Sequence, residues 1–146
     1  MPRPPPLAAA LAALLGESVA QVRVIERSWY VRLHGRAIAT TRRGRIYLRG
    51  TADEFFADPW LMLHEYWHVL GQWAPGRLTV PRYLLECLRR GYWENRFEVE
   101  ARAFADRHAP VLHGLLAGAS AEERLAPVET AGSKDEERRG GESHSH

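Results

Sequence analysis

Several residue types are scarce in this sequence, and each shortage excludes a class of protein. The single cysteine, Cys87, rules out an intramolecular disulfide, and nothing else demands an oxidising compartment, so we expect a cytoplasmic protein. No apolar run approaches the roughly 20 residues of a membrane-spanning helix, so we expect no membrane partner. Lysine occurs only at Lys134, and we attribute the 19 arginines to genome composition. Composition alone thus argues against disulfide-stabilised and membrane-spanning proteins.

What the sequence does contain is enough for one folded domain. Its 146 residues are 45% apolar and include five Trp and five Tyr, which can build a hydrophobic core. Residues 1–6 (MPRPPP) predict a disordered leader. From residue 118 the chain consists mainly of Ala, Glu, Ser, Gly and Arg, which predicts a disordered polar tail over residues 118–146. The folded domain is therefore expected to span residues 7–117.

The apolar stretch Leu7–Leu15 has two interpretations. Because Arg3 precedes it and Ser18-Val19-Ala20 is similar to a cleavage site, the stretch resembles part of a secretory signal. The proline-rich start and Glu17 in the supposed cleavage region favour an ordinary first helix that ends at Gly16. We therefore predict a helix in this stretch.

The remaining pattern predicts an α+β fold. Three short strands are expected in the N-terminal half, at residues 22–25, 37–41 and 45–48. They would form a small antiparallel sheet, with Gly44 in the turn between the last two strands. Three helices are expected to follow, over residues 58–73, over residues 82–90, and from Asn95 until Pro110 disturbs the pattern.

The hairpin between the last two strands is rich in positive charge. Four arginines gather there: Arg42, Arg43, Arg45 and Arg49. Such a cluster would suit an anionic partner. Because no nucleic-acid-binding motif accompanies it, we do not expect a nucleic-acid partner.

The most informative segment is His64-Glu65-Tyr66-Trp67-His68. Side chains four residues apart lie on one face of a helix, so the two imidazoles can bind a single Zn²⁺ ion. Glu65 then lies where a carboxylate can accept a proton from water. A helix is expected because Asp58 is a good N-cap and Pro59 suits the first helical position. The alternative is a buried helix whose histidines are only hydrogen-bonded.

A zinc site needs a third protein ligand, which this segment does not supply. The extended pattern HExxHxxGxxH would place a histidine at position 74, where this sequence has Ala74. The remaining option is a carboxylate from a later helix. Three candidates lie close together: Glu94, Glu98 and Glu100.

Helical phase favours Glu98 among these candidates. It borders Ala101, whose small side chain would let this helix approach the motif helix, whereas Glu100 lies on the other flank. Glu94 shares the favourable side only if the helix starts before Asn95. If Asn95 is the N-cap, the Glu98 carboxylate could return to the Asn95 N–H in a capping box instead. Glu98 is thus the favoured ligand, and Glu94 and Glu100 stay open as alternatives.

Five segments occur in an order typical of one family: VRV, RAIAT, RIYL, LMLHEYWHVLGQW and RFEVEARAFAD. Over about residues 7–109, the chain resembles a bacterial HExxH family of unknown function typified by the core domain of extracellular contractile injection systems. It also resembles related gluzincin-type metallopeptidases. The resemblance implies a minimal zincin-like domain in which His64, His68 and Glu98 bind zinc and Glu65 is the catalytic base.

The chain departs from thermolysin-like enzymes at Arg102, where these enzymes often carry an acidic residue that orients a histidine ligand. Support for the ligands is then expected from Asp106 or from a backbone carbonyl. Tyr83, Tyr92 and His108 are candidate donors to a developing oxyanion, and each is equally open to a packing role.

Together these features predict a zinc-dependent peptidase that acts on a peptide or protein substrate, with Glu65 as general base. The alternative is a catalytically inert zinc-binding or assembly module of the same fold, which the small size and the missing acidic residue favour. The two differ in whether metal removal abolishes activity or unfolds the chain.

Overall fold

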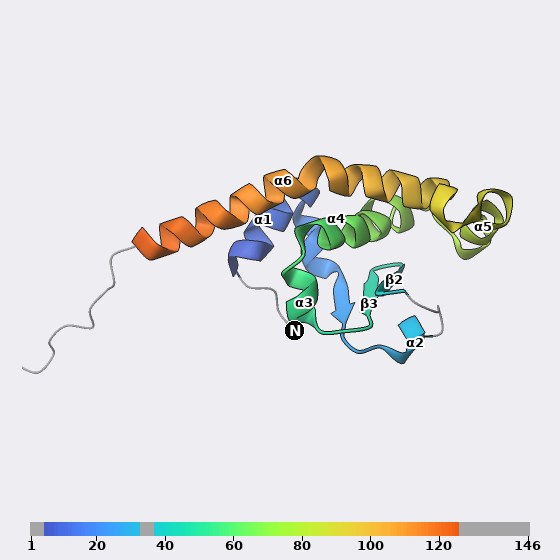
Figure 1. The fold of residues 1–146 in the computed structure, drawn as a ribbon, viewed down its shortest axis with the longest axis horizontal. Coiled ribbons are helices and arrows are strands. Elements are labelled where there is room, and N and C mark those ends of the chain that lie inside the picture. The colour runs from blue at the N-terminus through green and yellow to red at the C-terminus, as the bar shows by residue number, and fades with distance from the viewer. Residues whose placement is uncertain (1–4, 33–36, 126–146) are drawn as a thin grey trace, which may run out of the picture.

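The computed structural model describes residues 5–32 and 37–125, which form the α+β fold that the sequence predicts (Figure 1). In chain order, the elements are α1 (Pro5–Leu15), a 3₁₀ helix η1 (Glu17–Gln21), β1 (Arg23–Ile25), α2 (Trp29–Arg32), β2 (Ala39–Arg42), β3 (Arg45–Leu48), α3 (Ala52–Phe56), α4 (Pro59–Trp67), a π-helical segment η2 (His68–Trp73), α5 (Val80–Glu94) and α6 (Arg96–Leu125). The sequence pattern does not predict the short helices α2 and α3. Most of the predicted leader, residues 1–4, lies outside the described residues.

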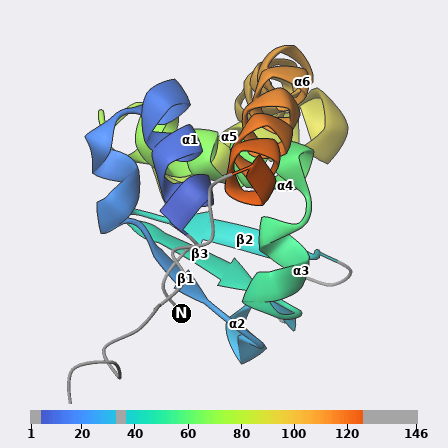
Figure 2. The ribbon, with the colours of Figure 1, turned by 90° about the vertical axis from the view of Figure 1, so that its left-hand side faces the viewer.

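The longer helices and the sheet enclose one hydrophobic core. Figure 2 shows α1, α4 and α6 on the same side of the three strands. The core lies between these layers and consists of buried apolar side chains: Leu11, Ile46, Leu48, Phe55, Met62, Leu63, Tyr66, Val69, Ala105 and Leu112. Within the described residues, no helix combines enough length with enough apolar character to cross a lipid bilayer.

The sheet is mixed rather than antiparallel, which corrects the prediction from sequence. β2 and β3 form the expected antiparallel hairpin, in which Ala39 lies opposite Leu48. β1 instead pairs in parallel with β3, with Arg23 opposite Arg45, so the strand order is β1-β3-β2. The segment between β1 and β2 is long enough to carry the chain past one strand position, as a parallel pair requires. β2 is therefore an edge strand.

The motif helix begins where the sequence predicts it. The Asp58 side chain accepts a hydrogen bond from the Leu61 N–H at 3.0 Å, and Pro59 occupies the first helical position. Between His68 and Trp73 the helix continues as a π-helical segment, a feature that is frequent at functional sites. The predicted helix over residues 58–73 is thus confirmed, with its last part wound more widely than an α-helix.

Helix α5 begins two residues before the predicted start at Arg82. The Thr79 side chain caps it by accepting a hydrogen bond from the Arg82 N–H at 3.3 Å. At Gly91 the backbone takes a φ of 75° and breaks the helix, at the position where the sequence predicts its end. Residues with a Cβ atom rarely adopt this backbone conformation, so the break in the helix depends on glycine.

Helix α6 is longer than the sequence predicts. It passes through Pro110 and ends at Leu125, so the prediction of a disordered tail is wrong for residues 118–125. The Ala, Leu and Glu residues in this stretch favour helix, and the fully buried Leu112 anchors the helix just after the proline. The rest of the predicted tail, residues 126–146, lies outside the described residues.

Candidate metal centre

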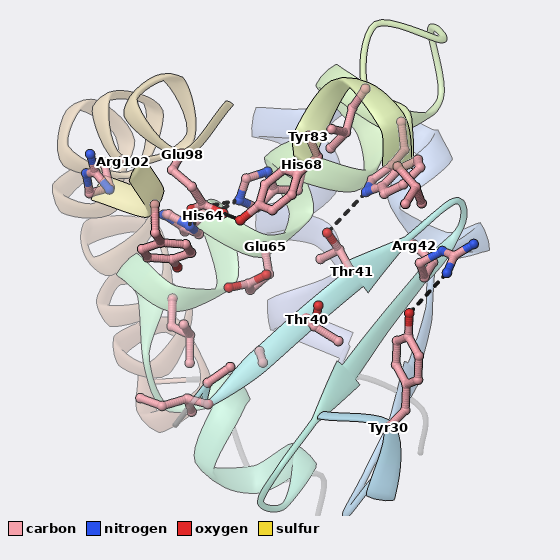
Figure 3. Close-up of a pocket in the computed structure, with 18 of the residues that line it drawn as sticks. Tyr30, Thr40, Thr41, Arg42, His64, Glu65, His68, Tyr83, Glu98 and Arg102 are labelled. Carbon is pink, nitrogen blue, oxygen red and sulfur yellow. Dashed lines mark hydrogen bonds and ion pairs between the residues drawn. The ribbon is translucent and has the colours of Figure 1, made fainter. Parts of the chain in front are cut away.

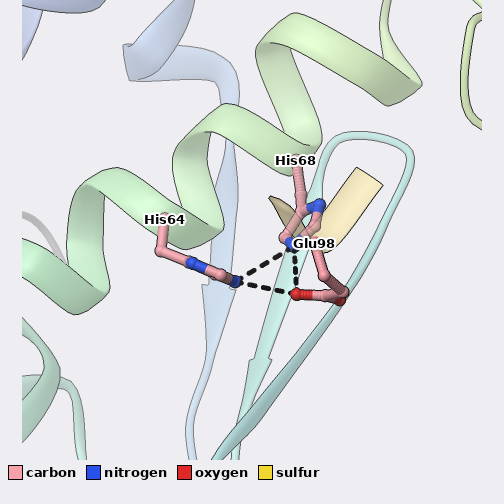
Figure 4. Close-up of side chains that lie close together, drawn as sticks. All are labelled: His64, His68 and Glu98. Carbon is pink, nitrogen blue, oxygen red and sulfur yellow. Dashed lines mark hydrogen bonds and ion pairs between the residues drawn. The ribbon is translucent and has the colours of Figure 1, made fainter. Parts of the chain in front are cut away.

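The two histidines of the motif point the same way from consecutive turns. Figure 4 shows His64 and His68 projecting from one side of their helix toward Glu98. The Nε2 atoms of the two histidines are 3.2 Å apart, and their ring centroids are 4.8 Å apart. This arrangement follows from the spacing of four residues, which stacks side chains on one helical face.

Glu98 completes the cluster from the first turn of α6. Its Oε2 atom lies 3.1 Å from His64 Nε2 and 3.3 Å from His68 Nε2. All three residues are buried, with exposed fractions of 6% for His64, 4% for His68 and 5% for Glu98. Among the described residues, these three side chains form a group that can hold a metal ion. The fold thus brings together the two histidines and the glutamate that the sequence favours.

The triangle of ligand atoms has the size of a tetrahedral metal site. Ligand atoms at about 2.0–2.1 Å from a zinc ion in tetrahedral geometry lie about 3.3–3.4 Å from one another. The three observed separations are 3.1, 3.2 and 3.3 Å. Two imidazole nitrogens and one carboxylate oxygen are also the donor set of many catalytic zinc sites. The donor atoms therefore fit a metal ion with three protein ligands.

The Glu98 carboxylate does not form a capping box. The Asn95 side chain caps α6 by itself, because its Oδ1 atom accepts a hydrogen bond from the Phe97 N–H at 2.9 Å. The Asn95 backbone N–H donates to the Tyr92 carbonyl at 3.3 Å rather than to Glu98. The carboxylate of Glu98 is therefore left to face the histidines.

The other two candidate glutamates lie outside the cluster. Glu94, at the end of α5, is exposed. Glu100 forms an ion pair with Arg77 at 2.7 Å and accepts a hydrogen bond from Trp67 Nε1 at 3.0 Å. The hydrogen bond from Arg77 lowers the pKa of Glu100. Glu100 therefore links α6 to the motif helix, on the flank where helical phase places it.

The electrostatics of the cluster favour a positive charge between the three side chains. Burial by itself would raise the pKa of Glu98, but hydrogen bonds from His64 and His68 outweigh it and hold this pKa well below its usual range. Burial also opposes charging of His68, yet its hydrogen bond to Glu98 and the nearby carboxylate charges raise its pKa. The anionic carboxylate of Glu98 and the imidazoles of His64 and His68 are thus arranged in a way that suits a bound cation.

Gln72, which lies one turn after His68, orients this histidine. The His68 Nδ1–H donates to Gln72 Oε1 at 2.7 Å, and Gln72 Nε2 donates to the Phe97 carbonyl at 2.9 Å. The first bond places the ring proton on Nδ1 and leaves Nε2 as the ligand atom. The prediction from sequence places such support at Asp106 or a backbone carbonyl and omits Gln72, although the spacing of four residues between His68 and Gln72 signals it.

Asp106 supports the other histidine only indirectly. It accepts a hydrogen bond from Trp60 Nε1 at 2.8 Å, and the Trp60 ring stacks on His64 with centroids 5.0 Å apart. The Nδ1 atom of His64 is buried and has no hydrogen-bond partner among the described residues. The ring of His64 is therefore held by aromatic packing rather than by a polar contact.

Tyr83 contacts the second oxygen of the ligand glutamate. Its hydroxyl donates to Glu98 Oε1 at 2.9 Å. Burial and the charge of Glu98 raise the pKa of Tyr83 far above its ordinary value, so the hydroxyl keeps its proton. Of the other candidate oxyanion donors, Tyr92 lines the same cavity, whereas His108 packs against Phe104, with ring centroids 4.4 Å apart.

The cluster of His64, His68 and Glu98 opens onto a cavity of about 730 Å³. In Figure 3, Thr40 and Thr41 mark the edge strand β2 on one side of the cavity, opposite the helices that carry Tyr83 and Glu98. Glu65 also lines the cavity, and its side chain is buried. Burial raises the pKa of Glu65, partly opposed by the two histidines. A carboxylate and a metal-binding cluster therefore share one cavity.

Searches of protein-family models, of curated proteins and of solved structures found no match to this chain. The site is therefore defined by its own geometry. It consists of a buried group of two histidines and one glutamate that can hold a metal ion. A carboxylate beside the group and a cavity in front of it complete the arrangement.

Proposed function

We propose that this protein is a zinc-dependent peptidase with a zincin-like domain. The observation that carries the proposal is the convergence of His64 Nε2, His68 Nε2 and Glu98 Oε2 to within 3.3 Å of one another, in the cavity that Glu65 lines. Three protein ligands leave one coordination position open, which is typical of catalytic rather than structural zinc sites. The sequence resemblance to HExxH metallopeptidases agrees with this proposal and stays a prediction.

Zinc is the metal that this donor set suits best. Imidazole nitrogens with one carboxylate oxygen recur in catalytic zinc sites. When bound, zinc would supply Lewis acidity, which lowers the pKa of a water molecule to about 7 and polarises a carbonyl group. The chain contributes a carboxylate that stays ionised at Glu98 and a histidine whose tautomer is set by Gln72.

Glu65 is the residue that we assign to proton transfer. Its carboxylate accepts a proton from the attacking water and gives it to the amide nitrogen as the peptide bond breaks. A general base works best when its pKa lies near the working pH, and burial raises the pKa of Glu65 in that direction. Its place directly after His64 on α4 puts this carboxylate in the cavity.

The edge strand β2 supports a peptide as the substrate. β2 pairs only with β3, so within the described residues the other side of its backbone has no strand partner. Residues of β2 and of the motif helix line the same cavity, and Trp73 Nε1 ties the two together by donating to Thr41 Oγ1 at 3.2 Å. An extended peptide can add to such an edge through main-chain hydrogen bonds, which places its carbonyl groups near Glu65.

Three single variants test this proposal by zinc content and by hydrolysis of an unfolded protein substrate. Glu65→Gln should keep stoichiometric zinc and lose activity by about 10²-fold or more, because it removes the proton acceptor. Glu98→Gln should lose zinc affinity, because it removes a ligand. Glu100→Gln is the matched control and should keep both, since Glu100 pairs with Arg77 outside the cluster. Hydrolysis by Glu65→Gln at the parent rate would disprove the peptidase proposal.

A further inference from the structure

Two arginines line the cavity in addition to the proposed metal site. Arg42 is the last residue of β2, and Arg102 lies on α6 one turn after Glu98. Figure 3 shows the two arginines on opposite sides of His64 and Glu98. The cavity therefore carries a guanidinium charge on each side of the cluster of His64, His68 and Glu98.

Aromatic contacts hold Arg42 in place without neutralising it. Its Nη1 atom donates to the Tyr30 hydroxyl at 3.0 Å, and the Tyr30 ring packs on Tyr47 with centroids 5.0 Å apart. The guanidinium carbon lies 5.8 Å from the centre of the Trp73 ring. No carboxylate among the described residues forms an ion pair with Arg42. The guanidinium group of Arg42 is thus held in position, and no carboxylate of the described residues neutralises its charge.

Arg102 is held in a similar way on the other side. Its guanidinium carbon lies 3.8 Å from the centre of the Trp93 ring, and its Nη2 atom donates to the Trp93 carbonyl. In the described part of the chain, Arg102 also forms no ion pair with a carboxylate. Because stacking and one carbonyl bond restrict its rotamers, less entropy is lost when Arg102 pairs with a ligand.

The two arginines of the cavity lining are balanced by carboxylates only as long as no metal ion is bound. The carboxylates in the lining are those of Glu65 and Glu98. A divalent cation held by the cluster would balance these two carboxylates. The two guanidinium charges then remain, which favours an anionic ligand.

The cavity wall also carries large apolar side chains. Four large side chains of the wall are exposed by 61–65%: Ile38, Leu84, Tyr92 and Trp93. Exposed apolar groups gathered in one cavity mark a binding surface rather than a solvated one. A matching ligand carries both apolar side chains and negative charges.

We propose that the substrate is an acidic peptide segment, in which apolar side chains flank the scissile bond and carboxylates farther out pair with Arg42 and Arg102. The inference rests on the peptidase function proposed above and specifies its substrate class. Arginine pairs with carboxylates through two parallel hydrogen bonds, which fixes the register of the peptide as well as adding affinity. In this arrangement Arg42 and Arg102 determine specificity and take no part in proton transfer.

The test uses three fluorogenic peptides that share an apolar centre and differ only in flanking Glu, Gln or Lys residues. With the zinc-loaded 146-residue chain, KM should be about tenfold lower for the Glu peptide than for the Gln peptide, and highest for the Lys peptide. The kcat values should stay similar, because the arginines bind equally before and during the reaction. A higher salt concentration should reduce the difference in KM between the Glu peptide and the Gln peptide.

Variants of single arginines test which side chains cause the preference for the Glu peptide. Arg42→Gln and Arg102→Gln should each reduce the preference for the Glu peptide, and the double variant should abolish it. Arg43→Gln and Arg107→Gln are matched controls, because both arginines are exposed outside the cavity lining. An equal reduction in the controls would overturn the proposal, since it would indicate a general effect of net charge.

A binding measurement separates this proposal from the peptidase proposal. Zinc-loaded Glu65→Gln should bind the Glu peptide more tightly than the Gln peptide in fluorescence anisotropy, whether or not the parent protein hydrolyses either. Equal binding of the two peptides would overturn the acidic-substrate proposal and leave hydrolysis unaffected. Displacement of the Glu peptide by an equal concentration of a single-stranded oligonucleotide would overturn it too, by showing a preference for phosphate.

Discussion

Single side chains hold each member of the cluster of His64, His68 and Glu98 in its conformation. Gln72 bonds to His68 and to a main-chain carbonyl, so its own position is fixed from both ends. Tyr83 holds the Glu98 oxygen that lies away from the histidines, and Trp60 stacks on His64. Ligands that are held before a metal arrives lose less conformational entropy on binding it.

Replacement of Gln72 tests this support at the residue scale. Gln72→Leu keeps the size of the side chain but removes the acceptor for His68 Nδ1–H. We expect the zinc affinity to fall by about 10–100-fold, measured by competition with a chelator on protein that circular dichroism shows to be folded. Gln72→Glu is the control, because it keeps an acceptor and should retain tight binding. A Gln72→Leu variant that binds zinc like the parent would show that Gln72 only packs.

At the scale of elements, the centre depends on how α4 and its π-helical extension lie along α6. The Trp67 ring stacks on Phe104 of α6, with centroids 4.4 Å apart and planes inclined by 13°, and Trp67 Nε1 donates to Glu100. Gly71 lies close to this ring, because a Cβ atom at residue 71 would come within 2.7 Å of the Trp67 indole. The lack of a side chain at Gly71 therefore permits the contact that aligns Glu98 with the histidines.

Gly71→Ala should therefore disturb the contact between the two helices. The indole cannot move away without losing its stack and its hydrogen bond, so we expect about 1–3 kcal/mol of destabilisation. A thermal unfolding experiment should show a Tm lower by roughly 5–10 °C. Gly114→Ala is the control, since a Cβ at this exposed position of α6 meets nothing within 4 Å. The control should be slightly stabilised, because alanine favours helix; equal Tm values for Gly71→Ala and the parent would contradict the packing argument.

At the scale of the whole molecule, the candidate metal site is separate from the main hydrophobic core. Side chains such as Leu11, Ile46 and Leu112 are fully buried between the helices and the sheet. The ligands lie at the cavity side of the motif helix instead. The fold therefore has a source of stability that does not require a metal.

Metal removal distinguishes the peptidase from an inert zinc-stabilised module. Chelation should abolish hydrolysis while the far-ultraviolet circular dichroism stays close to that of the zinc-loaded protein. The Tm should fall only by the contribution of ligand binding to stability, and added zinc should restore activity. Cooperative unfolding on chelation at room temperature would instead support the structural module.

Local features of this protein can be read from its sequence because they depend on neighbouring residues. The Asp58 cap, the helix that follows it and the shared face of His64 and His68 all follow from spacings of three or four residues. The hairpin of β2 and β3 follows from two short runs with Gly44 in the turn. The helix break at Gly91 follows from a conformation that few other residues adopt.

The tertiary structure alone decided which glutamate meets the histidines and which strand borders the cavity. Helical phase favours Glu98, but its convergence with His64 and His68 depends on the packing of α6 against α4, which joins residues 30 and 34 positions apart. The parallel pairing of β1 with β3 likewise depends on long-range packing, and it leaves β2 as one of the two edge strands. Short-range geometry is encoded residue by residue, whereas contacts between distant segments are selected by the burial of the whole core.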